Sequence, residues 1–100
     1  MPKDSINVGG KKYYYEYDAA HPDIKYGVQH LENLDKRGLS LKEAGNLFDS
    51  AHAQGSKSPN GVGRADFQDE LGRNFSLEAK VKRGFLGGET VQYKLVRRSE

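Results

Sequence analysis

The sequence predicts an α+β domain in which two amphipathic helices pack on an antiparallel sheet, in the order strand–helix–helix–strand–strand–strand. Three observations lead to this prediction. Apolar and polar residues alternate near the start and through the last third of the chain, which is typical of half-buried strands. Two central segments repeat apolar residues at helical spacing. The late strands are joined by short connections, which link antiparallel neighbours.

The composition indicates a single small soluble domain. The chain has 100 residues, so we expect residues 1–100 to share one core. No apolar run approaches the roughly 18 residues of a membrane helix, and the start lacks the apolar stretch of a secretory signal. There is no cysteine, which excludes disulfides and thiolate chemistry and fits a cytoplasmic location. The net charge of +2 permits contact with nucleic acid without requiring it.

The first elements are a flexible start and a strand. We expect residues 1–10 to be flexible, although Ile6 and Val8 alternate as they would in a strand. Residues 12–17 are predicted to form a strand, because three aromatic residues fall on one of its faces: Tyr13, Tyr15 and Tyr17.

The first helix is predicted to start at Pro22, because a proline at this position loses no hydrogen bond. Asp18 or His21 can cap it. It should end at Lys36-Arg37-Gly38, where cations meet the negative end of the helix dipole and a glycine follows. Its apolar face consists of Ile24, Val28, Leu31 and Leu34.

The second helix begins with a capping box, in which the Ser40 hydroxyl and the Glu43 carboxylate each accept from the other's backbone N–H. Gly45 weakens this helix or admits a close backbone approach. The helix should run out at Gln54-Gly55, and residues 56–63 are predicted to be a mobile loop because they are polar and rich in turn residues. The apolar face of this second helix consists of Leu41, Ala44, Phe48 and Ala51.

Three strands are predicted to complete the sheet, over residues 65–70, 73–82 and 90–98. Leu71-Gly72 and Gly84–Gly88 supply the turns. Alternation directs one set of residues into the core: Ala65, Phe67, Phe75, Leu77, Ala79, Val81, Val91, Tyr93 and Leu95.

The histidines offer candidate chemistry without a metal-binding spacing, so we expect no metal and no cofactor. His21 follows Asp18 by three residues, and the carboxylate could orient it as a general base. The alternative is that both are turn and capping residues. His30 lies on the flank of the first helix, and His52 lies near the end of the second, where it suits the helix dipole.

Basic residues gather in the predicted meander of the last three strands. Lys80, Lys82 and Lys94 should share the sheet face opposite the helices, and Tyr14 joins them if the first strand pairs in. A basic face with an aromatic residue suits phosphates and stacked bases, whereas the alternative is a merely solvated face. The candidate nucleic-acid contacts are Arg73, Lys80, Lys82, Arg83, Lys94 and Arg97.

Phe85 and Leu86 are predicted to occupy a hairpin tip, which is usually polar. They either fold back over the core or bind a protein partner.

The predicted element order resembles that of the RelE/ParE toxin superfamily and its ribonuclease relatives, and His30–Ser40 (HLENLDKRGLS) is similar to a helix-turn-helix in some of those domains. The resemblance implies RNA cleavage, with His30 or Tyr93 as general acid or base. It also implies that Arg73, Arg83 and Arg97 stabilise the phosphate.

A second stretch resembles the ribosome-cleaving colicin ribonuclease domains: Lys12-x-Tyr14 followed by Tyr17-Asp18-x-x-His21. This likeness nominates His21 as a catalytic residue. The position four residues later, where that family has a glutamate, is Lys25 in this chain.

Three functions therefore stay open. The first is a small binding or regulatory protein that contacts RNA or a protein partner. The second is a RelE-like toxin domain that cleaves RNA through the basic residues of the meander, and the third is a nucleic-acid binder without chemistry, whose affinity should fall steeply with salt.

Overall fold

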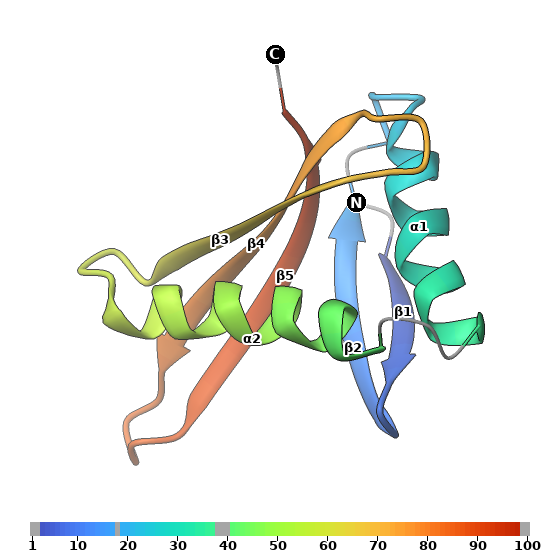
Figure 1. The fold of residues 1–100 in the computed structure, drawn as a ribbon. Helices are drawn as coiled ribbons and strands as arrows, with labels where there is room; N and C mark the ends of the chain where they lie inside the picture. Colours follow the sequence, from blue (N-terminus) through green and yellow to red (C-terminus); the bar gives the residue numbers. More distant parts are fainter. Residues whose placement is uncertain (1–2, 18, 38–40, 99–100) are drawn as a thin grey trace.

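Five strands form one sheet, and two helices lie on the same face of it (Figure 1). This arrangement comes from a computed structural model, which describes residues 3–17, 19–37 and 41–98. The described elements are β1 (Lys3–Val8), β2 (Lys11–Tyr17), α1 (Ile24–Arg37), α2 (Leu41–Lys57), β3 (Val62–Gln68), β4 (Asn74–Arg83) and β5 (Glu89–Arg97).

The sheet is mixed, with the order β1-β2-β5-β4-β3. β1 and β2 form an antiparallel hairpin, and β3, β4 and β5 form an antiparallel meander. The two units join where β2 runs parallel to β5, over Tyr15–Tyr17 and Tyr93–Leu95. The prediction of a wholly antiparallel sheet was wrong at this junction, because alternation fixes which residues face the core and not which strands become neighbours.

The predicted element order lacked β1, which lies within the segment expected to be a flexible start. Ile6 and Val8 alternate into the core and are 4% and 7% exposed. Burying two branched apolar side chains and pairing the strand with β2 provides the stabilisation that the sequence alone did not reveal. α2 also runs on to Lys57 and β3 begins at Val62, so the segment expected as a loop over residues 56–63 shortens at both ends.

Aromatic rings connect the sheet to the helices. Phe48 of α2 is fully buried, stacks on Tyr13 at 4.2 Å between ring centroids, and meets Tyr93 edge-on at 4.9 Å. Gly27 gives α1 its close approach, because a Cβ there would lie 3.0 Å from the Phe75 ring. The predicted core of β4 is confirmed for Phe75, Leu77 and Ala79, which are all fully buried, whereas Val81 is half-buried.

α2 also packs closely on β3 through two buried glycines, Gly55 and Gly63. A Cβ on Gly63 would overlap the Ala51 carbonyl oxygen and the Gly55 amide nitrogen. The close approach that we considered for Gly45 occurs here instead, since a Cβ on Gly45 would meet only Val8, at 3.6 Å.

The three predicted helix-terminal arrangements fall partly outside the described residues, which include neither Asp18 nor Gly38 nor Ser40. Within the described part, the His21 carbonyl accepts a hydrogen bond from the Ile24 N–H at 3.1 Å, which forms the turn into α1. The helix therefore begins two residues after the predicted Pro22.

Candidate functional site

The sheet surface opposite the helices, which we call the open face, consists of the strand residues that alternate with the core residues. Its charged members are Lys3, Lys12, Arg64, Lys80, Lys82, Lys94 and Arg98, and Glu16, Asp66 and Glu78. Seven cations against three carboxylates give this face a net charge of +4, although the whole chain carries only +2. The open face therefore concentrates the positive charge of the protein.

The predicted gathering of lysines on one face agrees with the strand register. Lys80 of β4 pairs with Gln92 of β5, Lys82 pairs with Thr90, and Lys94 pairs with Glu78. Tyr14 of β2 also lies on the open face, 64% exposed, with the Lys12 ammonium 5.8 Å from its ring centroid. β2 and β5 adjoin, so this tyrosine belongs to the same surface as the lysines.

The carboxylates of the open face are mostly engaged by cations of the same face. Glu16 lies 3.6 Å from Lys3, and Asp66 lies 3.3 Å from Arg64 and 3.5 Å from Arg98. A hollow of about 170 Å³ is lined by Val62, Ala79 and Tyr93 and by charged and amide residues of β2, β4 and β5, namely Glu16, Glu78, Lys80, Gln92 and Lys94. Such a surface offers charge and hydrogen bonds without an enclosed pocket.

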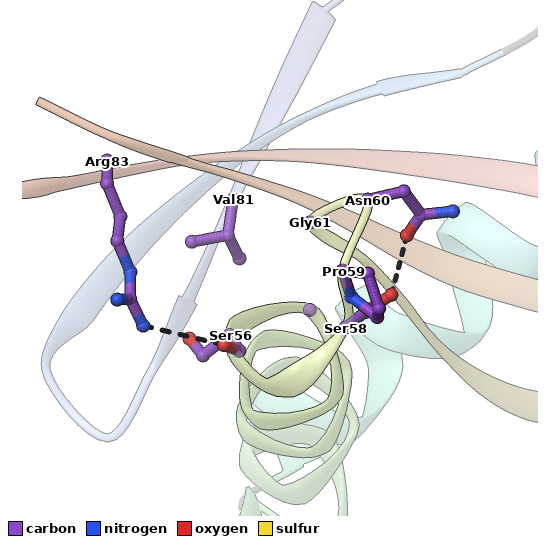
Figure 2. Close-up of a pocket in the computed structure, with 8 residues that line it drawn as sticks. Ser56, Ser58, Pro59, Asn60, Gly61, Val81 and Arg83 are labelled. Carbon is purple, nitrogen blue, oxygen red and sulfur yellow. Dashed lines mark hydrogen bonds between the residues drawn. The ribbon is translucent and has the colours of Figure 1, made fainter.

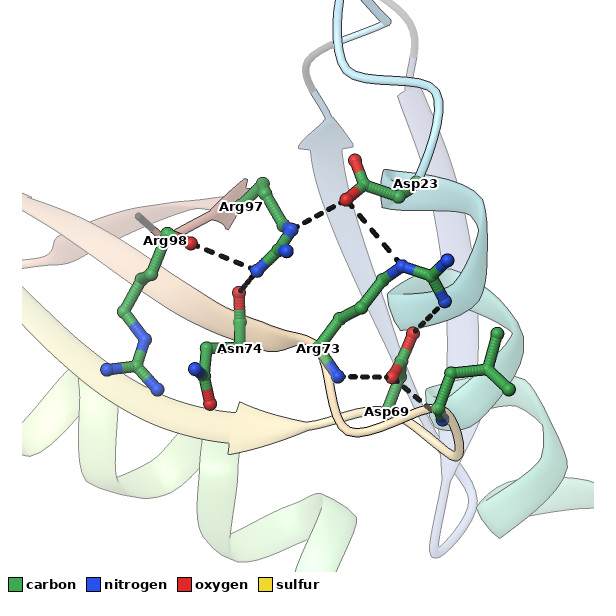
Figure 3. Close-up of polar contacts among 7 residues, drawn as sticks. Asp23, Asp69, Arg73, Asn74, Arg97 and Arg98 are labelled. Carbon is green, nitrogen blue, oxygen red and sulfur yellow. Dashed lines mark hydrogen bonds and ion pairs between the residues drawn. The ribbon is translucent and has the colours of Figure 1, made fainter. Parts of the chain in front are cut away.

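Two of the predicted phosphate-binding arginines lie elsewhere, at the end of the sheet near the start of α1 (Figure 3). Asp23 accepts a hydrogen bond from Arg97 Nε at 2.6 Å and lies 3.7 Å from Arg73 Nε. The Arg97 hydrogen bond, with help from the charges of both arginines, lowers the pKa of the Asp23 carboxyl. Arg97 also donates to the Asn74 and Arg98 carbonyls. These arginines thus tie α1 to β4 and β5.

Asp69 holds the turn that carries Arg73. Its side chain is fully buried, and Oδ1 accepts from the backbone N–H groups of Leu71 and Arg73 at 2.9 and 2.8 Å. The Arg73 guanidinium lies 3.9 Å from Asp69 and 4.4 Å from the ring centroid of Tyr26. Asp69 and Asp23 were not among the residues predicted from the sequence. An Asp two residues before Leu71-Gly72 is an Asx-turn signal that could have revealed Asp69.

Arg83, another predicted phosphate contact, lies at the opposite end of β4 beside a pocket of about 390 Å³. Figure 2 shows Arg83 and the Ser58–Asn60 turn on opposite sides of Val81. Arg83 donates to the Ser56 carbonyl at 3.5 Å and lies 3.8 Å from Glu89.

The Glu89 carboxylate contacts three side chains near this pocket, one of which is Arg83. It lies 3.2 Å from His52 Nε2 and accepts from the Ser56 hydroxyl at 3.1 Å. The hydrogen bond with His52, followed by that with Ser56, lowers the pKa of Glu89. The carboxylate lies between the histidine and the serine, whereas nucleophilic catalysis needs the histidine beside the hydroxyl. This cluster therefore does not activate Ser56.

The three predicted catalytic residues lie on separate parts of the fold. His21 is exposed before α1, and His30 lies on α1 with its ring 5.9 Å from that of buried Phe67. Tyr93 lies on the helix side of β5 among core rings, where burial raises its pKa to about 12. The open face includes none of these three side chains, so the predicted acid–base groups and the predicted lysines do not share a surface.

Phe85 and Leu86 occupy the tip of the β4–β5 hairpin, as expected, and are 103% and 95% exposed. They do not fold back over the core, so of the two roles that we considered, contact with a protein partner is the one that stays a prediction. Among residues 3–17, 19–37 and 41–98, no group of His, Cys, Asp and Glu side chains is placed to hold a metal. Neither helix of the described chain is long and apolar enough to span a membrane.

Comparison with protein-family models, with curated proteins and with solved structures found no match for this chain.

Proposed function

We propose that this protein binds single-stranded RNA through the open face and does not cleave it. The observation that supports this proposal is the net charge of +4 on an uncovered sheet surface that also presents an exposed tyrosine. Lysines neutralise backbone phosphates, and an aromatic ring stacks on unpaired bases. A sheet surface suits a single strand because its bases are accessible, whereas the groove of an RNA duplex hides its base edges.

Binding without cleavage follows from where the candidate acids and bases lie. Cleavage of RNA requires a general base and a general acid at the same phosphate. His21, His30 and Tyr93 belong to a turn, a helix flank and the core, while the lysines lie on the open face. Arg73 and Arg97 are already engaged by Asp23.

The test is binding of a fluorescent twelve-nucleotide oligouridylate, followed by anisotropy over a series of salt concentrations. With about four phosphates neutralised, the plot of log affinity against log salt should have a slope of about −3. A variant with Lys80→Gln, Lys82→Gln and Lys94→Gln should reduce the steepness of this slope by about 2.

A matched control removes the same amount of charge from the helix layer. Lys25→Gln, Lys42→Gln and Lys57→Gln change exposed lysines of α1 and α2 and should leave the slope unchanged. Tyr14→Ala should weaken binding about 5- to 150-fold, whereas Tyr14→Phe should retain affinity because its ring still stacks. Equal effects of the two lysine triples would refute the assignment of the open face.

The order strand–helix–helix–strand–strand–strand that begins at β2 also favours a second candidate, the RNA-cleaving toxin-like domain. Gel analysis of the same oligonucleotide, and of ribosomal RNA on intact ribosomes, separates the two. Cleavage that disappears in His21→Ala or His30→Ala would replace the binding proposal with the catalytic one. Intact RNA after prolonged incubation would exclude the toxin-like activity.

A further inference from the structure

The junction between β2 and β5 is only three residues long, although both strands continue beyond it. Lys11–Tyr14 of β2 pairs with β1 on its outer side, and Glu89–Gln92 of β5 pairs with β4. No strand in the described chain pairs with the sides that these two segments turn toward each other. Figure 1 shows β2 and β5 diverging from their junction, so the sheet contains an internal split.

Unpaired strand edges require a particular kind of occupant. Each backbone N–H and C=O is a strong hydrogen-bonding group, and a free strand edge is a template for another chain. An extended polypeptide presents donors and acceptors at the spacing of a strand, whereas a nucleic acid or a small molecule does not. The split therefore fits a peptide segment.

Two pockets lie beside the split, one on each face of the sheet. On the helix side, a pocket of about 240 Å³ is lined by Lys11, Tyr13, His52, Val91 and Tyr93, among others. On the open face, a pocket of about 300 Å³ is lined by Lys3, Tyr14, Glu16 and Gln92, and it shares Tyr14, Val91 and Tyr93 with the first. Side chains of a strand alternate between faces, so the two pockets would receive alternate residues of one extended peptide.

The charges around the split indicate which residues it accepts. Lys11 and Lys12 are exposed on β2. Two of the carboxylates nearby are engaged, because Glu16 pairs with Lys3 and Glu89 pairs with His52 and Arg83. Lys11 and Lys12 line the helix-side pocket together with His52, so acidic side chains are favoured there, and apolar ones are favoured on the open face against the Tyr14 ring and Val91.

We propose that the split between β2 and β5 binds an extended acidic peptide as an additional strand, with alternating acidic and apolar residues. This site does not depend on the RNA-binding proposal, because backbone pairing carries it. The proposal assigns a protein partner to the molecule in addition to RNA.

A capped heptapeptide of alternating glutamate and valine (EVEVEVE) is the probe. It should bind and slow amide hydrogen exchange within Lys11–Tyr14 and Glu89–Gln92, as measured by nuclear magnetic resonance. The same peptide with N-methylated valines keeps its charges and most of its side chains but loses alternate backbone donors, so it should bind at least tenfold more weakly. A lysine–valine version should also bind at least tenfold more weakly.

A charge-reversal variant provides the protein-side test, with exposed residues that do not contribute to the core. Lys11→Glu with Lys12→Glu should weaken binding of the glutamate peptide at least tenfold and favour the lysine peptide. The matched control, Lys25→Glu with Lys42→Glu on the helices, should leave both affinities unchanged.

Three results would overturn the proposal. One is no binding of the glutamate peptide up to about 1 mM, the weakest affinity that counts as specific in this assay. Another is protection on the outer edges, within Lys3–Val8 or Val62–Gln68, which would make the peptide an edge ligand. The third is protection of the split by oligouridylate and not by the peptide, which would assign the split to RNA.

Discussion

Replacing Gly63 with alanine should destabilise the protein severely, whereas the same change at Gly45 should stabilise it. A Cβ on Gly63 would overlap two backbone atoms of α2, the Ala51 oxygen and the Gly55 nitrogen. Backbone atoms cannot escape by changing rotamer, so α2 and β3 must separate. Overpacking costs about 1–3 kcal/mol, and we expect the upper end of this range. A domain of this size has a stability of about 5–15 kcal/mol, so the loss is a large fraction.

The change at Gly45 has the opposite sign because the space beside it is free. The new Cβ would make an ordinary contact with Val8 at 3.6 Å, and alanine is about 0.5–1 kcal/mol more favourable than glycine inside a helix. The glycine of α2 at this position therefore serves no close packing.

Thermal unfolding followed by far-ultraviolet circular dichroism measures both effects. About 3 kcal/mol corresponds to a loss of roughly 12–24 °C in Tm for Gly63→Ala, and Gly45→Ala should gain roughly 2–8 °C. In urea, the midpoint of Gly63→Ala should fall by about 1–3 M. If the free energy of unfolding of Gly63→Ala lies within about 0.5 kcal/mol of that of the parent protein, the close packing of α2 on β3 is refuted.

Three further predictions follow from the ionisable and exposed groups. The pKa of Asp23 is lowered in the folded state, so its contribution to stability is present above its ordinary value of 3.8 and is lost as pH falls through the folded pKa. Asp23→Asn should therefore reduce the free energy of unfolding at neutral pH, and this difference should shrink in strong acid; a difference independent of pH would contradict the ion pair. Burial raises the pKa of Tyr93 to about 12 from its ordinary value of 10.0. The stability that comes from its neutral phenol is therefore intact below pH 10.0 and is lost as the pH rises from 10.0 through the folded pKa of about 12. Ultraviolet titration should show a late-ionising phenol that Tyr93→Phe removes, and an unchanged titration curve would refute its burial. Finally, Phe85→Ser with Leu86→Ser should leave stability within about 0.5 kcal/mol, because both side chains are exposed, yet should shorten retention on a hydrophobic column more than Leu71→Ser does. Equal retention of the two variants would argue against a projecting apolar tip.

Individual strands could be predicted because they depend on the local alternation of apolar and polar residues. Alternation located β4 within one residue at each end and identified its buried face, because Phe75, Leu77 and Ala79 have no other way to leave water. The split at β2 and β5 could not be predicted. The parallel pairing of β2 with β5 joins segments from the two halves of the chain, and nothing in the sequence of either segment specifies the other as its partner.

The candidate site also contains residues whose position the sequence predicted and a contact that it could not reveal. Lys80, Lys82 and Lys94 were placed on one face by strand periodicity, and the register agrees. Arg97 has the opposite phase, in step with Leu95, so the sequence already indicated that it points toward the helix layer. Its partner Asp23 could not be identified, because the contact spans 74 residues and depends on where α1 begins.

The short parallel junction also determines the order in which the protein can assemble. Pairing β2 with β5 closes a loop that includes both helices, β3 and β4, and closing a long loop costs more chain entropy than forming a local hairpin. The meander and α2 are nearer neighbours in the chain, so we expect them to fold first and the N-terminal hairpin to dock last. Native-state hydrogen exchange should then find that the amides of β1 and β2 open at a lower free energy than those of β4. A site created by the last docking step is also the first to be lost, so any ligand of the split would stabilise the whole molecule against partial unfolding.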